Sequence, residues 1–442
     1  MSALQSHRAR WGGAVAGAIL ALALVVRLGA GYWWQERLPP EKSLAFGDSE
    51  SYWYLGQKLA RGESFEFGSP GAKIFRTPGY PVLLAMLFRL LGDDSPAPLV
   101  VRSLSAICGT AAVAAVMGLA WRMFGARPAL LAGLVAAVHP EVVSLGVFIL
   151  SEAPFHPLLV LNILCVREAW LAAAKLNDNP VTKGANAGRR DRIWALLAGV
   201  TAGLATLMRP SWLLFLPYFL AFGSLTSAGR SRVVRLVLPL LAGLCVVMAP
   251  WWWRNYEVTG RFVPTTLQVG ASLYDGWHPE ATGASDMRFT PQFIADQRAA
   301  DAAAKGPLTD TFEERLDRRH RDAALQWASA HPGRVLELMV IKLGRMWSPL
   351  PNAREVGGAL VRLVTLCAYM PLMGLAVWQT ARRWRAGSAD WIVWLPAIYL
   401  TNLHVIFVSS LRYRQPALLP LIALAVGGLG EWWWRRRAGG AA

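Results

Sequence analysis

The sequence predicts an all-α polytopic membrane protein, and three features of the chain indicate this fold class. Apolar runs of eighteen or more residues with few charges recur along its 442 residues, as they do in membrane-spanning helices. Many of its 21 tryptophans stand at the ends of these runs, where aromatic side chains occupy the bilayer interface. Basic residues cluster in alternate connections between the runs, which is how loop charges set the orientation of a membrane protein.

The first apolar run, about 11–31, follows a basic amino end and is longer than a signal-peptide core. We therefore expect a retained helix that starts in the cytoplasm. Nine more runs follow, near 99–121, 129–149, 154–174, 193–208, 211–227, 234–253, 357–381, 390–409 and 413–434. The sequence thus predicts about ten transmembrane helices in the cytoplasmic (inner) membrane, with the amino and carboxy ends both cytoplasmic.

Positive charge supports this topology, because five basic connections all fall on the side of the amino end. The sets are Arg122 and Arg127; Lys175, Lys183, Arg189, Arg190 and Arg192; Arg230, Arg232 and Arg235; Arg382, Arg383 and Arg385; and Arg435 to Arg437. A net charge of +17 would also suit a nucleic-acid binder. Small basic clusters between apolar runs are typical of loop charges instead, so we expect no nucleic acid partner.

One apolar segment, 78–92, is short and contains Arg89. At about 1.5 Å per residue it reaches about 22 Å, less than the roughly 30 Å of a bilayer core. A span here would make eleven transmembrane helices and would reverse every later one. We expect an interfacial or re-entrant helix.

Two sizeable segments, 32–98 and 254–356, then lie on the outer side of a single transmembrane domain that covers 1–442. In the first, Tyr52, Leu55 and Leu59 share one helical face, which we expect to rest on the membrane surface. In the second we expect amphipathic helices, one of which begins with Asp310 and Glu313 spaced as a capping box. The four cysteines stand singly in apolar runs, so neither a disulfide framework nor a zinc site is expected.

Ionisable residues gather at the predicted outer ends of the helices, where each is costly unless it has a role. They are Asp48, Arg76, His139, Glu141, Glu152, Arg209, Arg254, Arg412 and Arg414, with Asn255, Tyr256 and Tyr413 beside them. Several arginines at one depth suggest a cavity for an anion such as a phosphate. Simpler roles exist for each residue: Asp48 and Glu152 stand where they could cap helices, and the arginines could be interfacial anchors.

The order of short sequence blocks resembles a known family. They are "GDSESYWYLGQKLARG", "RTPGYPVLLAMLFRLLG", "LSEAPF", "LMRPSWLLFLP", "APWWWRNYEVTGRFVPT", "HPGRVLELMVIKLGRMWSP" and "LRYRQPALLPLIALAVGG". Together they are similar to the GT-C membrane glycosyltransferases, in the bacterial branch related to protein O-mannosyltransferases and lipid A aminoarabinose transferases. The resemblance covers about 10–435. It implies the GT-C fold and a sugar donor on a polyprenyl phosphate, used at the outer or periplasmic face.

The resemblance also implies roles for individual residues. Asp48 matches the catalytic carboxylate and would act as base, and Arg76 matches a basic residue that contacts the donor phosphate. Relatives often carry a second carboxylate just before that basic residue, where this chain has Phe75. We expect Arg254, Arg412 and Tyr413 to help hold the phosphate, and transfer to invert the anomeric carbon.

Other expectations are less specific. Glu152 would position the acceptor or share a divalent metal ion with Asp48; no cofactor is certain and a metal remains open. We expect the substrate pocket to contain Tyr52, Tyr80, His139, Arg209 and Asn255. The acceptor could be a lipid, a protein or a polysaccharide, and membrane lipids are expected partners.

Two functions of other classes are weighed against a hexosyl or pentosyl transferase. A transporter or flippase for a lipid-linked anionic substrate should carry its ionic residues at mid-membrane and show broken helices in paired halves, and no internal repeat is evident. A non-catalytic scaffold would leave the outer arginines without a role.

Overall fold

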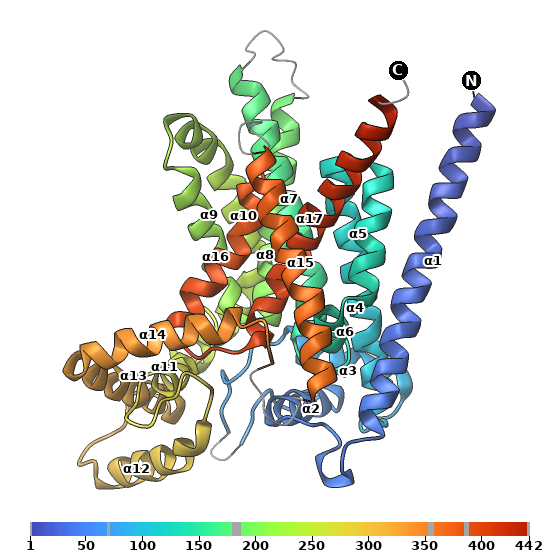
Figure 1. The fold of residues 1–442 in the computed structure, drawn as a ribbon. Helices are drawn as coiled ribbons and strands as arrows, with labels where there is room; N and C mark the ends of the chain where they lie inside the picture. Colours follow the sequence, from blue (N-terminus) through green and yellow to red (C-terminus); the bar gives the residue numbers. More distant parts are fainter. Residues whose placement is uncertain (1, 69–70, 179–186, 352–357, 384–388, 440–442) are drawn as a thin grey trace.

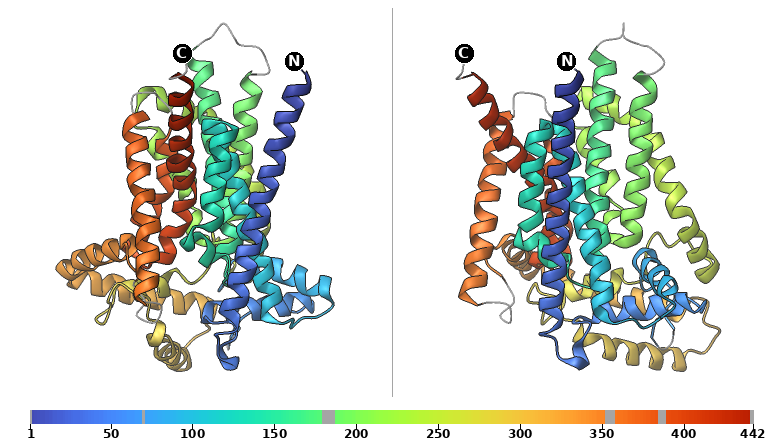
Figure 2. Two further views of the ribbon diagram at one scale, coloured as in Figure 1. Left: turned by 45° about the vertical axis from the view of Figure 1, so that its right-hand side comes forward. Right: turned by 90° about the vertical axis from the view of Figure 1, so that its right-hand side faces the viewer.

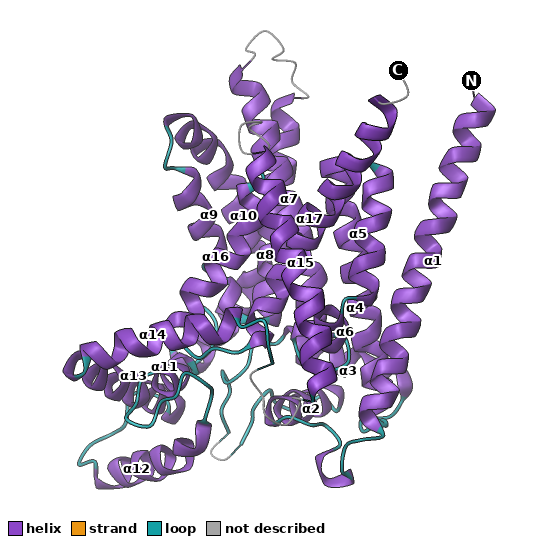
Figure 3. Cartoon of the chain, in the orientation of Figure 1, coloured by secondary structure: helices purple, strands orange, loops and turns teal. Residues whose placement is uncertain are grey.

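The computed structural model describes residues 2–68, 71–178, 187–351, 358–383 and 389–439. Regular structure in these ranges is helical, apart from one isolated antiparallel bridge between Phe67 and Ala72. Figure 3 shows the same all-helical composition. Lys183 and Arg385, two of the basic residues used to predict the topology, lie outside the described residues.

Seven described helices are long and apolar enough to cross a membrane. They are α1 (Ser2–Gln35), α4 (Pro98–Phe124), α7 (Glu152–Asp178), α8 (Ala187–Met208), α10 (Ser227–Thr259), α15 (Ala359–Arg383) and α17 (Leu411–Gly439). Shorter apolar helices are α3 (Gly79–Leu91), α5 (Ala126–Val138), α9 (Phe215–Gly223), which follows the 3-10 turn η3 (Pro210–Trp212), and α16 (Trp391–Ile406). Each of the ten predicted runs contains one of these helices, so the prediction of a polytopic helical membrane protein is confirmed.

The long helices run side by side, and the two ends of the bundle differ (Figures 1 and 2). Both termini lie at the upper end of Figure 1. At the lower end, shorter helices lie across the bundle: α2 (Gly47–Ala60), α3, α11 (Val269–Gly276), α12 (Thr290–Ala303), α13 (Phe312–Ala330) and α14 (Pro332–Trp347). The two predicted outer segments therefore meet at the end away from the termini.

The third predicted run is broken, because α5 ends at Val138 and α6 (Pro140–Leu145) begins a separate short helix. Pro140 has no N–H for the Ala136 carbonyl and pushes His139 into an extended conformation, with ψ 122°. Buried Arg27 of α1 supplies the missing donors: its guanidinium donates to Ala136 at 3.2 Å and to Ala137 at 3.0 Å. This arginine, which lies inside the first apolar run, thus repairs a helix break.

Helix α3 lies at the lower end of the bundle against α2, as expected for a segment too short to span. Trp53 packs on Phe88 with ring centroids 5.2 Å apart, and the Arg89 guanidinium donates to the Leu59 and Ala60 carbonyls at the end of α2. The prediction that one face of α2 rests on the membrane surface is wrong. Leu55 is fully buried in the protein core.

The second outer segment also differs from expectation by one residue. Helix α13 begins at Phe312, and its capping box is formed by Thr311 and Glu314, not by Asp310 and Glu313. Glu313 instead reaches the first outer segment, where its carboxylate accepts the backbone N–H groups of Lys73 and Ile74 at 2.9 and 3.0 Å. This contact ties the two outer segments together next to Arg76.

Candidate active site

Asp48 lies in the first turn of α2, but its carboxylate does not cap the helix. The N-cap residue is Phe46, and no side chain caps this end. The backbone carbonyl of Asp48 accepts a hydrogen bond from Ser51 at 2.8 Å, which leaves the carboxylate to face other elements. The simple capping role is therefore excluded for this residue.

Two carboxylates and three arginines form a continuous chain of alternating charge, here called the ion-pair chain. Asp48 contacts Arg76 at 2.6 Å through Oδ1 and Arg412 at 3.3 Å through Oδ2. Arg412 bridges to Glu152, with its Nε 3.0 Å from Oε1. Arg209 closes the chain, with Nη1 2.5 Å from the same Glu152 oxygen. The order is thus Arg76, Asp48, Arg412, Glu152, Arg209.

The members of the ion-pair chain come from four places in the sequence. Asp48 and Arg76 belong to the first outer segment, Glu152 is the first residue of α7, Arg209 follows the last residue of α8, and Arg412 is in the first turn of α17. The long helices α7, α8 and α17 all present one end here, at the lower end of Figure 1. The arginines face carboxylates inside the protein, so interfacial anchoring does not describe Arg76, Arg209 or Arg412.

Exposure differs along the ion-pair chain. The Glu152 side chain is only 2% exposed, whereas those of Asp48 and Arg412 are 37% and 27% exposed. An incoming molecule would therefore reach Asp48 and Arg412 first. Glu152 is a buried negative charge that holds Arg209 and Arg412 in place from behind.

Aromatic rings flank the arginines. The Arg209 and Arg412 guanidinium carbons lie 5.8 and 5.3 Å from the centroid of the Tyr413 ring, and His404 stacks on that ring at 4.0 Å. On the other side, Arg76 lies 5.0 Å from the Tyr52 ring. Guanidinium groups bind favourably over aromatic faces, so these rings fix the orientation of the cations.

Electrostatics keep Asp48 ionised. Burial opposes its negative charge, but Arg76 and Arg412 outweigh burial and lower the pKa of Asp48 to about 2. Because both carboxylate oxygens already have cationic partners, Asp48 is a weak proton acceptor in this arrangement.

The other residues predicted for the substrate pocket or the donor phosphate divide into two groups. Tyr52 and Tyr80 lie beside the ion-pair chain: the Tyr52 hydroxyl donates to Ser151 at 3.1 Å, and Tyr80 packs edge-on against Tyr52. Three other predicted residues are engaged elsewhere. Arg254 donates to the Lys73 and Phe65 carbonyls, Asn255 to the Val263 and Thr265 carbonyls, and His139 is buried at the break between α5 and α6. These three shape the fold around the site and do not join the ion-pair chain.

Sequence reasoning missed two features of the site. It placed Arg209 in a general pocket and did not pair it with Glu152, and it did not single out Gln268, whose Oε1 accepts from Arg76 at 3.4 Å. It noted Glu141 and Arg414 only as members of a set. They form a separate buried ion pair at 2.8 Å, and Arg414 also donates to the Met346 carbonyl at 3.2 Å, so this pair joins α6 to the ends of α14 and α17.

The carboxylates are not arranged as a metal site. Within the described ranges, no three His, Cys, Asp or Glu side chains come together as a set of metal ligands. Arg412 stands between Asp48 and Glu152 and contacts both. A divalent ion shared by the two carboxylates would have to displace Arg412.

Comparison with known proteins adds to this geometry. The sequence profile of the family described as Dolichyl-phosphate-mannose-protein mannosyltransferase matches residues 76–179, a segment that contains both Arg76 and Glu152. The structure is similar to the archaeal oligosaccharyltransferase AglB from Archaeoglobus fulgidus in complex with an inhibitory peptide and a dolichol-phosphate, at 14% identity and a TM-score of 0.56, over 95% of this chain and 50% of that one. The chain has the GT-C fold.

A second archaeal structure agrees with this fold. The apo form of the Archaeoglobus fulgidus oligosaccharyltransferase gives a TM-score of 0.54 at 16% identity, over 93% of this chain and 50% of that one. ArnT from Cupriavidus metallidurans bound to undecaprenyl phosphate is matched over 92% of this chain and 77% of that one, at 15% identity and a TM-score of 0.42. This GT-C chain spans about half the length of the archaeal structures. A comparison with curated proteins gives no significant sequence match.

Proposed function

We propose that this GT-C protein is a glycosyltransferase that takes a sugar from a polyprenyl-phosphate donor, at the membrane face opposite its two termini. The observation that carries the proposal is the ion-pair chain, which places a carboxylate between arginines at one end of the bundle. A bound dolichol-phosphate in the structurally similar archaeal enzyme supports a lipid phosphate as the donor group. On the prediction that both termini are cytoplasmic, this face is the outer or periplasmic one.

Charge balance supports an anionic donor. Three arginines and two carboxylates leave the ion-pair chain with one uncompensated positive charge. A sugar linked to a polyprenyl phosphate is a phosphodiester with one negative charge, so its binding neutralises the site. Guanidinium groups are suited to bidentate contacts with phosphate oxygens, and Arg76 and Arg412 are the arginines that flank the more exposed carboxylate.

The same contacts would couple donor binding to catalysis. Phosphate oxygens compete with Asp48 for Arg76 and Arg412, and each cation drawn away raises the proton affinity of the carboxylate. Asp48 would then accept the proton of the acceptor hydroxyl as that oxygen bonds to the anomeric carbon. The bond from this carbon to the phosphate oxygen breaks, and its electron pair leaves with the phosphate. Attack from the side opposite the phosphate inverts the configuration.

The arginines would also stabilise the products. Cleavage converts the phosphodiester into a polyprenyl phosphate that carries a second negative charge, and cations fixed in advance at developing charge can contribute several kcal/mol to catalysis, about 3 in well-studied cases. Glu152 would keep Arg209 and Arg412 aligned for this role. A transporter is less well supported, because the ion-pair chain lies at one end of the bundle and not at its middle.

The proposal is tested by incubating purified protein with a panel of polyprenyl-phosphate sugars, both hexosyl and pentosyl, and with lipid, peptide and polysaccharide acceptors. We expect slow donor hydrolysis or transfer with at least one donor, and a loss of about 100-fold or more in the Asp48→Asn variant. Folding of the variant is followed by size-exclusion chromatography. Equal turnover by wild type and by a well-folded Asp48→Asn variant would exclude Asp48 as the base.

A further inference from the structure

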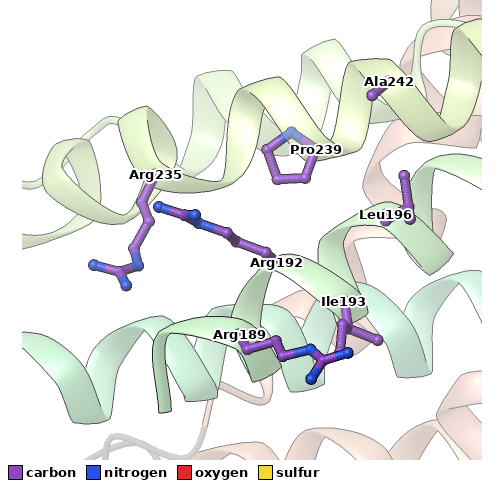
Figure 4. Close-up of a pocket in the computed structure, with 7 residues that line it drawn as sticks. All are labelled: Arg189, Arg192, Ile193, Leu196, Arg235, Pro239 and Ala242. Atoms are coloured by element: carbon purple, nitrogen blue, oxygen red, sulfur yellow. The ribbon is translucent and has the colours of Figure 1, made fainter. Parts of the chain in front are cut away.

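A second charged site lies far from the ion-pair chain, between the amino-terminal parts of α8 and α10. There an open groove of about 500 Å³ lies between the two helices (Figure 4). Its lining is Arg189, Arg192, Ile193 and Leu196 of α8 and Arg235, Pro239 and Ala242 of α10. These parts of α8 and α10 are at the end of the bundle where the termini lie (Figure 1).

The groove exists because the two helices touch below it and separate above. A Cβ on Gly199 would meet the Leu240 carbonyl and the Leu244 nitrogen, and one on Gly243 would meet the Leu196 carbonyl. The helix backbones are therefore in direct contact at this pair of glycines. The lining residues of the groove all lie on the amino-terminal side of this contact, and Pro239 is one of them.

Positive charge is concentrated at the mouth of the groove. Arg235 is paired through Nε with Asp191, a fully buried residue of α8. Arg189 and Arg192 are exposed and have no ion-pair or hydrogen-bond partner for their side chains in the described part of the chain. In Figure 4 the Arg192 side chain extends from α8 toward Arg235. Three arginines and one carboxylate leave two uncompensated positive charges.

Polarity changes along the groove in the way that a phospholipid requires. From Arg189 to Leu196, and likewise from Arg235 to Ala242, seven residues advance about 10 Å along a helix. Over this length the lining changes from guanidinium groups to apolar side chains, with Ile193 and Leu196 still 45% and 41% exposed. An anionic headgroup at the mouth would thus place its acyl chains against the apolar wall.

We propose that this groove is a binding site for an anionic glycerophospholipid of the leaflet on the side of the termini. The headgroup phosphate binds Arg189, Arg192 and Arg235, and the first carbons of the acyl chains pack on Ile193, Leu196 and Ala242. Basic pockets between transmembrane helices are suited to such headgroups, at about 1 kcal/mol for each cation near the membrane surface. The site is independent of the ion-pair chain and of the proposed transfer reaction.

The test is lipid binding to the full-length protein in neutral detergent, measured by native mass spectrometry with added phosphatidylglycerol, phosphatidylcholine or inorganic phosphate. We expect phosphatidylglycerol adducts that millimolar inorganic phosphate does not displace, and few phosphatidylcholine adducts. The Arg189→Gln/Arg192→Gln variant should bind phosphatidylglycerol about 30-fold more weakly, from about 1 kcal/mol for each of two charges. The Arg190→Gln/Arg230→Gln variant is the control, because it removes two exposed charges at the same end that do not line the groove.

Three results would overturn the proposal: equal binding of phosphatidylcholine, displacement of phosphatidylglycerol by inorganic phosphate, or an equal loss in the control variant. A second measurement does not require any variant to fold. A phosphatidylglycerol that carries a photoreactive acyl chain should label wild-type peptides from 193–196 and 239–242. Labelling confined to other helices would also contradict the site.

Discussion

Substitution of Arg412 and substitution of Glu152 should have opposite effects on the binding of a lipid phosphate, although the two residues contact each other. Arg412→Gln removes the one uncompensated positive charge of the ion-pair chain, and Glu152→Gln raises that charge to two. If the arginines serve to bind phosphate, the first variant weakens binding and the second strengthens it. If the contact between the two residues only holds the fold together, both variants weaken binding.

The structure sets the size of each effect. A hydrogen bond to a charged group contributes about 1.5 to 3 kcal/mol, so loss of Arg412 should weaken binding of undecaprenyl phosphate by about 10- to 150-fold. Arg412 stands between Glu152 and an incoming phosphate, so the two negative charges would be about 7 Å apart. At that distance their repulsion is about 0.6 kcal/mol in water and about 2.4 kcal/mol near a protein surface. Removal of the Glu152 charge should therefore tighten binding by about 3- to 60-fold. Arg209 still pairs with the residue at 152 when Arg412 is absent, so the first variant should fold.

The assay is titration of the purified variants with undecaprenyl phosphate in detergent, followed by thermal shift or calorimetry. Arg288→Gln is a suitable control, because Arg288 is an exposed residue of the second outer segment that pairs only locally with Asp286. Unchanged affinity in Arg412→Gln, or weaker binding in a well-folded Glu152→Gln, would refute the assignment of these arginines to the phosphate.

Three further predictions concern the stability and topology of the fold. Burial raises the pKa of Glu313 to about 7, against 4.5 for an ordinary glutamate. As pH rises, Glu313 therefore loses its proton in the unfolded chain before it does so in the folded protein. The stability that Glu313 contributes then falls as pH rises from about 4.5 to about 7. The thermal unfolding temperature should hence vary less between pH 5 and pH 8 in Glu313→Gln than in wild type. Glu337→Gln, which removes one partner of an exposed ion pair, is the control and should leave this pH profile unchanged. Equal pH profiles for Glu313→Gln and wild type would contradict the burial argument. Gly199→Ala should destabilise the fold by about 1 to 3 kcal/mol, because its Cβ meets the α10 backbone. Gly374→Ala is the control: its Cβ would have no neighbour within 4 Å, so this variant should be neutral or more stable by up to about 1 kcal/mol. Similar unfolding temperatures for the two variants would refute the contact between α8 and α10. A topology reporter fused after Gly92 should be active on the side opposite the termini, and a cytoplasmic signal would mean that α3 spans the membrane.

The local sequence pattern was sufficient to predict those features that the bilayer thickness or the hydropathy of a single segment fixes. Length and hydropathy placed the long helices, and the shortness of 78–92 separated α3 from them, because a helix must match the bilayer thickness to cross it. The local pattern was less reliable for predicting which part of the protein or membrane a helical face contacts. Tyr52 and Leu55 read as a stripe that faces the membrane surface, but both are buried in the protein. Tyr80 of α3 packs on Tyr52, whose hydroxyl donates to Ser151, and Leu55 lies in the protein core. A helical face predicts that something apolar covers it, not whether lipid or protein does.

The sequence by itself determined the fold class, the sidedness of the basic connections and the set of ionisable residues at one end of the bundle. It could do so because the cost of placing charge or unpaired backbone in hydrocarbon applies to each segment separately. Only the tertiary structure decided which of those residues act together. Arg254 and Arg412 look alike as arginines after apolar runs, yet one binds backbone carbonyls of the first outer segment and the other joins Asp48 to Glu152. Charge pairing depends on distances between helices that are far apart in the chain, and no local pattern encodes them.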